Sequence, residues 1–362
     1  MNSQLKQRHS SPGTARRIVE FAVSFALAVL ILFALFRHFD LHQTAESLRK
    51  ARPGLLIIAV LLMAAADLLR GWRWRIWQRS LSFWYSVQVI QIGFMGNNIL
   101  PGRLGEFLRA HCASAKAHDD WGRTAALGSI VGERILDGLV LGAFGLAALR
   151  LVHLDRRLAW GLFLPSLAFA GLAVGLVLSV RHQERIRRLV VAANHRFPGR
   201  LTSFARDKAG QLLDGIVPLG TLPRMLAAIT STAVMWCFEG GIGYAVGLAL
   251  WPDMSLRTAL LFLVVVNFAT LVPVTMGGIG TIEVAVPLYL ISSGVSAPLA
   301  LAMVLLQHTG RYLFNTIAGA VFYLGGGFHG HFVDRGSLRA PQLRRNDSTN
   351  GRAVQADMVC EP

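Results

Sequence analysis

The residues of this sequence most able to do chemistry are charged side chains within or beside long apolar runs. They fall into three groups, namely Arg103 with Glu106, Glu133 with Arg134 and Asp137, and Glu239 with Glu283 and Arg311. A charged side chain at the centre of a membrane helix costs about 2.5–3.5 kcal/mol on insertion scales, so it usually faces a cavity or an opposite charge. Each residue is therefore a candidate for binding a polar ligand, with structural ion pairing as the alternative.

The first group belongs to a turn, residues 97–106, in which Pro and Gly interrupt an apolar run. If the stretch 103–117 is helical, its free backbone N–H groups and Arg103 form an anion site at the turn, and a lipid phosphate fits such a site. Asn97 and Asn98 begin the turn and are candidates for the same site. The alternative is an Arg103–Glu106 pair that only stabilises the turn.

The second group lies early in the apolar run 124–149. Glu133 and Asp137 are four residues apart, so they share one face of a helix and repel each other if both are ionised. Arg134 can neutralise one of them or meet a partner on another helix. A ligand site and a structural ion-pair network near the cytoplasmic end are equally compatible with this pattern.

The third group lies in the C-terminal half. Glu239 has no cation beside it in the sequence, and a lone carboxylate in an apolar setting tends to hold a proton and can carry one. The alternative is a structural residue, protonated or paired with an arginine. Arg311 shares a helix face with Gln307 and His308 and is the strongest candidate to bind a phosphate directly. Its alternative role is to pair with Glu239 or Glu283.

The composition places these residues in a membrane protein. Of the 362 residues 53% are hydrophobic and 15% charged, and the mean hydropathy is +0.48, whereas about 25% of a soluble domain is charged. The net charge of +16 comes from loops and tails, which excludes a nucleic-acid site. Nine apolar runs are helix candidates: 18–36, 54–72, 82–100, 124–149, 158–180, 224–250, 256–273, 279–293 and 298–324. The first is expected to be an uncleaved helix rather than a signal peptide.

Basic residues set the expected orientation. The N-terminus, the stretch 70–79, the segment 181–208 and the C-terminal tail are rich in Lys and Arg, which places all four in the cytoplasm. Residues 82–118 must then enter and leave from the cytoplasm, and residues 256–293 from the outside. Each is either a re-entrant hairpin or a pair of spans.

The turns of these two segments, 97–106 and 272–283, resemble each other. Both read as an apolar run, a proline, a glycine-rich stretch and a glutamate, and the second contains Gly277 and Gly278. Broken segments at corresponding positions of two halves are the best sequence indication of a transporter site. We therefore expect paired re-entrant hairpins whose turns line a polar cavity. Ordinary loops are the alternative.

The expected fold is all-α and integral to the membrane, with about six spanning helices and two opposed re-entrant hairpins in inverted halves. Residues 1–17 form a cytoplasmic N-terminal segment, 18–325 a polytopic membrane domain, and 326–362 a basic, disordered cytoplasmic tail.

Three motifs carry a resemblance to a known family: residues 100–106, Glu133-Arg134 with Asp137-Gly138, and Pro273 through the glycines to Glu283. In this order they resemble the flippase-like transmembrane domain of lysylphosphatidylglycerol synthases, over residues 20–325. The resemblance implies an inner-membrane domain that moves, or helps to move, a lipid between leaflets. Some stand-alone members accompany hopanoid biosynthesis. Residues 274–276 depart from the family pattern, because they separate Pro273 from the glycine pair.

We expect transport of a lipid or lipid-linked anionic headgroup across the inner membrane. The partners are then a phospholipid or another amphiphilic lipid and possible enzymes of lipid biosynthesis. The alternatives are an intramembrane headgroup transferase and a non-catalytic member of a lipid-synthesis complex. The sequence leans against an enzyme, because too few residues follow 325 to fold an aminoacyl-transfer domain. No catalytic triad, nucleotide motif or cofactor motif occurs, and His329-Gly-His331 is too weak a pattern to predict a metal.

Reporter fusions test the predicted topology. Fusions after residues 79, 210 and 340 are expected to report the cytoplasm, because each follows a stretch rich in Lys and Arg. A periplasmic signal at residue 210 would overturn the hairpin interpretation, since the two halves would then no longer have opposite orientations.

Overall fold

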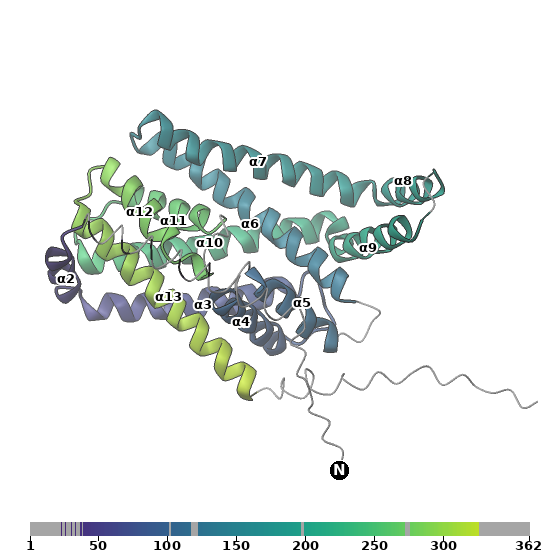
Figure 1. The fold of residues 1–362 in the computed structure, drawn as a ribbon, viewed down its shortest axis with the longest axis horizontal. Coiled ribbons are helices and arrows are strands. Elements are labelled where there is room, and N and C mark those ends of the chain that lie inside the picture. Colours follow the sequence, from purple (N-terminus) through teal and green to yellow (C-terminus); the bar gives the residue numbers. More distant parts are fainter. Residues whose placement is uncertain are drawn as a thin grey trace, which may run out of the picture.

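The computed structural model describes residues 39–100, 103–116, 122–196, 199–271 and 276–325, with a few isolated positions between 23 and 37. Every regular element in these residues is helical, as the sequence predicts (Figure 1). In chain order they are α2 (Leu41–Arg49), α3 (Pro53–Trp74), α4 (Phe83–Ile99), α5 (Gly105–Lys116), α6 (Arg123–Leu151), α7 (Arg156–Arg181), α8 (Gln183–Arg196), α9 (Arg200–Ile216), η2 (Val217–Gly220), α10 (Leu222–Leu250), α11 (Leu256–Ala269), η3 (Met276–Gly278), α12 (Thr281–Ser292) and α13 (Ala297–Gly325).

Three helices among the described residues are long and apolar enough to cross a membrane: Pro53–Trp77, which includes α3, then α7 and α10. Helix α7 exposes much of its apolar surface, including Leu164, Leu167 and Leu172, as expected for contact with lipid. Helices α6 and α13 have 29 residues each and are also longer than a hydrocarbon core requires. Five of the six expected spans thus have a helix in their place. The first, 18–36, lies almost entirely outside the described residues, as do the segments 1–17 and 326–362.

Two pairs of shorter helices occupy the positions of the expected hairpins. Helix α4 (17 residues) packs on α5 (12 residues), and α11 (14 residues) packs on α12 (12 residues). A helix of 17 residues is about 25 Å long, which is shorter than the hydrocarbon core of a bilayer. In Figure 1 the α4/α5 pair lies nearer the end with α8 and α9, and the α11/α12 pair lies nearer α2.

Backbone conformation explains why the helix is interrupted between α4 and α5 and between α11 and α12. After α4 the chain is extended at Leu100, and Arg103 has a positive φ of 56°. In the second turn Gly277, Gly278 and Gly280 have φ of 61°, 78° and 89°, values that side-chain-bearing residues rarely adopt. The breaks therefore occur where the sequence predicts them.

Helices α8 and α9 are elements that the apolar runs do not reveal. Helix α8 and the first half of α9 lie within the basic segment 181–208 that the sequence assigns to the cytoplasm, and α9 packs along α6. The approach is close at Gly128, where a Cβ atom would lie 2.2 Å from the carbonyl oxygen of Leu212. Both helices are amphipathic, so their apolar residues alternate along the sequence with polar and charged ones and form no long continuous apolar run.

Helix packing within the first pair depends on Gly105. A Cβ atom there would lie 2.0 Å from the carbonyl oxygen of Gly93 and 2.4 Å from the backbone nitrogen of Asn97. We expect Gly105→Ala to force α5 away from α4 and to lower the free energy of unfolding by about 1–3 kcal/mol, the usual range for overpacking. Thermal unfolding of the purified protein in detergent measures this loss.

Gly54→Ala is the matched control, since a Cβ atom at Gly54 meets nothing within 4 Å. It is expected to leave the melting temperature unchanged or slightly raised. Equal stability of Gly105→Ala and Gly54→Ala would contradict the close packing of α4 and α5.

Candidate functional site

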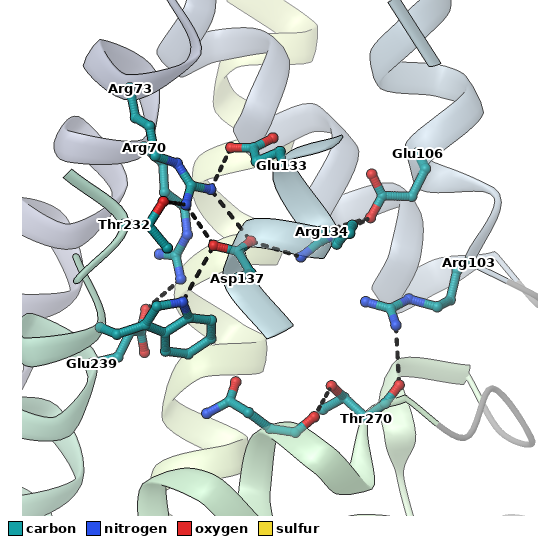
Figure 2. A network of polar contacts seen from close by, with 12 residues as sticks. Arg70, Arg73, Arg103, Glu106, Glu133, Arg134, Asp137, Thr232, Glu239 and Thr270 are labelled. Atoms are coloured by element: carbon teal, nitrogen blue, oxygen red, sulfur yellow. Dashed lines mark hydrogen bonds and ion pairs between the residues drawn. The ribbon is translucent and has the colours of Figure 1, made fainter. Parts of the chain in front are cut away.

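Arg73 is the centre of a buried ion-pair network near the C-terminal end of α3. Its side chain, 2% exposed, lies between the two carboxylates of α6, donating to Glu133 at 2.5 Å and to Asp137 at 2.5 Å (Figure 2). It also donates to the hydroxyl of Thr232 on α10 at 3.0 Å. The repulsion between Glu133 and Asp137 is thus relieved by an arginine from another helix. The basic stretch 70–79 is correspondingly not wholly a surface feature, because Arg73 is buried.

Two further arginines surround the α6 carboxylates. Arg109 of α5 pairs with Glu133 at 2.8 Å, and its guanidinium lies 4.0 Å from the ring centroid of Trp74. Arg134 pairs with Glu106 at 2.5 Å and approaches Asp137 at 3.8 Å. Glu106 is therefore paired across helices with Arg134, and the alternative of an Arg103–Glu106 pair is wrong.

Glu239 is the centre of a second network. It accepts from Arg70 at 2.7 Å and forms an ion pair with Arg311. Asp67 shares both arginines, at 2.6 Å from Arg70 and 3.3 Å from Arg311, and accepts from Gln91 at 2.5 Å. The expectation that Glu239 is a lone carboxylate is wrong, because its cations come from helices distant in the sequence.

Asp67 and Arg70 are network residues that the sequence analysis missed. The Lys and Arg pattern places Arg70 with the cytoplasmic basic residues, and Asp67 belongs to none of the three charged groups. A signal was present, because Asp67 lies inside an apolar run and precedes Arg70 by three residues, the spacing of neighbours on one helix face.

Arg103 differs from these arginines, because the described residues offer it no carboxylate partner. It donates to the carbonyl oxygen of Thr270 at 3.1 Å and so connects the turn after α4 to the end of α11 (Figure 2). The same turn contacts α13, because the Asn98 side chain donates to the carbonyl oxygen of Tyr312 at 3.1 Å and to the hydroxyl of Thr316 at 2.9 Å. Gly277 of the other turn lies close by, since its Cβ position is 3.7 Å from the Cα of Asn98. The two turns thus meet beside α13.

Glu283 pairs with a histidine rather than with Arg311. One carboxylate oxygen accepts from the backbone N–H of Gly280 at 2.6 Å, and the other lies 2.5 Å from Nδ1 of His308. Nε2 of His308 lies 3.0 Å from the carbonyl oxygen of Gly277. This pair fastens the second turn to α13.

A cavity of about 200 Å³ lies between the two turns. It is lined by nine of the twelve predicted site residues, namely Asn97, Asn98, Arg103, Arg134, Asp137, Glu239, Gly277, Gly278 and Arg311. The other three do not line it. Glu106 and Glu283 pair with the cavity-lining side chains of Arg134 and His308, whereas Glu133 pairs with arginines that do not line the cavity. The lining also includes Arg70, Trp236, Gln307 and His308. Within the described residues no cluster of His, Cys, Asp and Glu suits a metal ion, and His329 and His331 lie outside them.

The fold and this cavity define a helical membrane protein with a charged site between two broken helix pairs. The chain belongs to the lysylphosphatidylglycerol synthase transmembrane-region family, whose match covers residues 18–319. It is also similar to glycosyltransferase AglD of Haloferax volcanii, with 26% identity over 351 residues. That alignment covers 85% of this chain and 54% of the relative, so the chain spans about half the length of that protein.

Removal of Arg73 tests the structural role of the first network. Arg73→Gln leaves two buried carboxylates without their shared cation, and we expect the free energy of unfolding to fall by about 3–5 kcal/mol. The double variant Arg73→Gln/Asp137→Asn is expected to recover part of the loss. Thermal unfolding and expression level measure both variants.

Arg75→Gln is the control, because Arg75 lies at the same helix end with an exposed side chain. It is expected to change stability by less than about 0.5 kcal/mol. If Arg73→Gln proved as stable as Arg75→Gln, the network would not hold α3 to α6.

Proposed function

We propose that this protein moves a lipid with an anionic, phosphate-containing headgroup between the leaflets of the inner membrane, with both termini in the cytoplasm. The observation that carries the proposal is Arg103, a cavity-lining arginine that donates to a backbone carbonyl and has no carboxylate partner among the described residues. A guanidinium in a largely apolar protein interior requires an anion, and it matches the oxygens of a phosphate.

The charges around the cavity support a singly charged ligand. The two networks and Arg103 comprise six arginines, Arg70, Arg73, Arg103, Arg109, Arg134 and Arg311, and five carboxylates, Asp67, Glu106, Glu133, Asp137 and Glu239. With all of these ionised, one positive charge remains. A phosphodiester carries one negative charge and balances it.

Arg103 is a stronger candidate for the first phosphate contact than Arg311, the residue that the sequence favours. Arg311 already shares Glu239 with Arg70, whereas Arg103 shares no carboxylate with any described arginine. One nitrogen of Arg311, Nη1, is buried without a hydrogen-bond partner, and Arg311 also lines the cavity. Arg311 therefore remains available as a second contact to the same headgroup.

The size of the cavity favours a headgroup over a whole lipid. About 200 Å³ accommodates a glycerol phosphate, but it does not accommodate two acyl chains. In this proposal the chains stay in the bilayer while the headgroup crosses the protein. The α4/α5 and α11/α12 pairs act as re-entrant hairpins from opposite sides, so movement of either turn opens the cavity to one side.

The similarity to a protein named glycosyltransferase favours a second candidate. The chain could serve as the membrane half of a headgroup-transferring system and present the lipid to a partner enzyme. The two candidates differ in what the isolated protein can do. A transporter moves lipid by itself, whereas a presenting subunit requires the enzyme.

Reconstituted vesicles test the transport proposal with fluorescent NBD-phosphatidylglycerol, whose exposure in each leaflet is read by dithionite quenching. The wild-type protein is expected to equilibrate this probe between leaflets. Arg103→Gln is expected to slow it about 10- to 100-fold, the effect of losing one charge-assisted hydrogen bond. Arg103→Lys is expected to be partly active, because an ammonium lacks the bidentate fork of a guanidinium.

Two controls accompany this assay. Arg150→Gln alters an exposed arginine at the end of α6 and should leave the rate unchanged. Arg103→Gln should also keep the wild-type melting temperature, because no buried carboxylate loses its partner. Absence of probe movement by the wild type alone, with movement restored by a partner enzyme, would favour the second candidate.

A further inference from the structure

The Glu283–His308 pair contacts oxygen atoms at both nitrogens of the histidine ring. Nδ1 lies 2.5 Å from a carboxylate oxygen of Glu283, and Nε2 lies 3.0 Å from the carbonyl oxygen of Gly277. Both side chains are largely buried, with 12% of His308 and 6% of Glu283 exposed. The histidine lines the cavity, and the glutamate lies behind it.

Hydrogen bonding at both nitrogens requires an additional proton. A neutral imidazole donates through one nitrogen only, and a backbone carbonyl cannot donate. The hydrogen on Nε2 must therefore point to Gly277, and a second hydrogen must lie between Nδ1 and Glu283. Whether that hydrogen belongs to an imidazolium or to a carboxylic acid, the pair holds one proton more than a neutral imidazole and an ionised carboxylate. If the pair loses this proton, a lone pair on one ring nitrogen faces a lone pair on an oxygen. One of the two hydrogen bonds of His308, to Glu283 or to Gly277, is then broken.

The other ionisable groups around His308 are already engaged or lie elsewhere. On α13 itself Arg311 is paired, and Tyr312 donates to the carbonyl oxygen of Asn98. Helix α10, which packs against α13, carries Glu239 in its network and also Arg224, Cys237 and Tyr244. On α4 and α12 the groups are Tyr85, which donates to the Cys112 carbonyl, and Tyr289, which donates to the Leu158 carbonyl. Helix α2 carries the exposed His42, Glu46 and Arg49. Of these only Glu239, Arg311 and Tyr312 line the cavity with His308.

We propose that the Glu283–His308 pair is the coupling site of this transporter and binds one proton together with each anionic headgroup. The inference rests on the proposed function. With the proton bound, the pair is neutral and the cavity keeps its one positive charge. Without it, the pair carries one negative charge and cancels that attraction. Headgroup binding and proton binding therefore favour each other, and by linkage the effect is reciprocal.

The position of the Glu283–His308 pair connects its charge to the turn of the α11/α12 pair, which moves in the proposed transport. Gly277, which accepts from Nε2, belongs to the turn that approaches Asn98 of the opposite turn. Loss of the proton weakens either this link or the link to Glu283, whose other oxygen holds the N–H of Gly280. Release of the proton thus loosens the α11/α12 turn from α13 as the headgroup leaves.

Two measurements test the coupling site. The first is solution NMR of the detergent-solubilised protein with labelled histidine, which reports the protonation of both ring nitrogens without any transport. In a pH titration we expect the pair to bind one proton, seen either as protons on both nitrogens of His308 or as a protonated Glu283. In Glu283→Gln the side-chain amide can itself donate to Nδ1, so His308 should carry a proton on one nitrogen only. A neutral His308 beside an unprotonated Glu283 at every pH at which the protein moves lipid would overturn the proposal.

The second measurement is the distribution of NBD-phosphatidylglycerol in vesicles with a pH gradient and the membrane potential clamped to zero. With one proton per lipid, a gradient of one pH unit should enrich the probe about tenfold in the leaflet facing the alkaline side. His308→Gln should abolish the enrichment, and His42→Gln, at an exposed histidine, should retain it. Equal leaflet distributions despite active probe movement would overturn the coupling but not the transport proposal. A wild type that moves no probe would contradict the transport proposal, while the NMR titration would still decide whether the pair binds the proton.

Discussion

The ion pairs of Arg73 with Glu133 and Asp137 join α3 to α6, and all three side chains are almost fully buried. Each of these charges alone is costly in a low-dielectric interior, and the two carboxylates repel each other from adjacent turns of α6. They are tolerable only with a guanidinium between them. This requirement fixes the position of α3 against α6, and Arg109 extends it to α5 by pairing with Glu133. The first helix pair is thereby held at the α6 carboxylates.

Pairing with carboxylates also distinguishes the arginines around the cavity from one another. Arg70 and Arg311 converge on Glu239 and Asp67, so three helices are held by one compact cluster. Arg103, in contrast, reaches across to a backbone carbonyl at the end of α11 and has no carboxylate among the described residues. The other arginines are held in ion pairs, and the unpaired Arg103 lines the cavity.

The turns of the two short helix pairs need outside hydrogen-bond partners, because a broken helix leaves backbone groups without partners. Side chains of α13 supply two of these partners: the Tyr312 hydroxyl donates to the carbonyl oxygen of Asn98, and Nε2 of His308 contacts the carbonyl oxygen of Gly277. Helix α13 therefore acts as a common support for both turns. In the proposed function, this support allows the two turns to respond to the same headgroup and the same proton.

The sequence by itself determined the all-helical class, the helix breaks after residue 99 and near residue 270, and many of the charged residues that line the cavity. These features are local, because a charge within an apolar run and a proline followed by glycines can be recognised without knowing the fold. The family resemblance over most of the chain adds to them and agrees with the match to residues 18–319. The sequence analysis missed helices α8 and α9, because their apolar residues alternate along the sequence with polar and charged ones.

Only the tertiary structure decided which charges meet. Glu239 has no cation nearby in the sequence, yet Arg311 and Arg70 reach it from 72 and 169 residues away. Glu106 pairs with Arg134 instead of the nearer Arg103, and Glu283 pairs with His308 instead of Arg311. The energy of an ion pair depends on the distance between its charges and on their exposure to water. Both are set by how the helices pack, which no local pattern in the sequence contains.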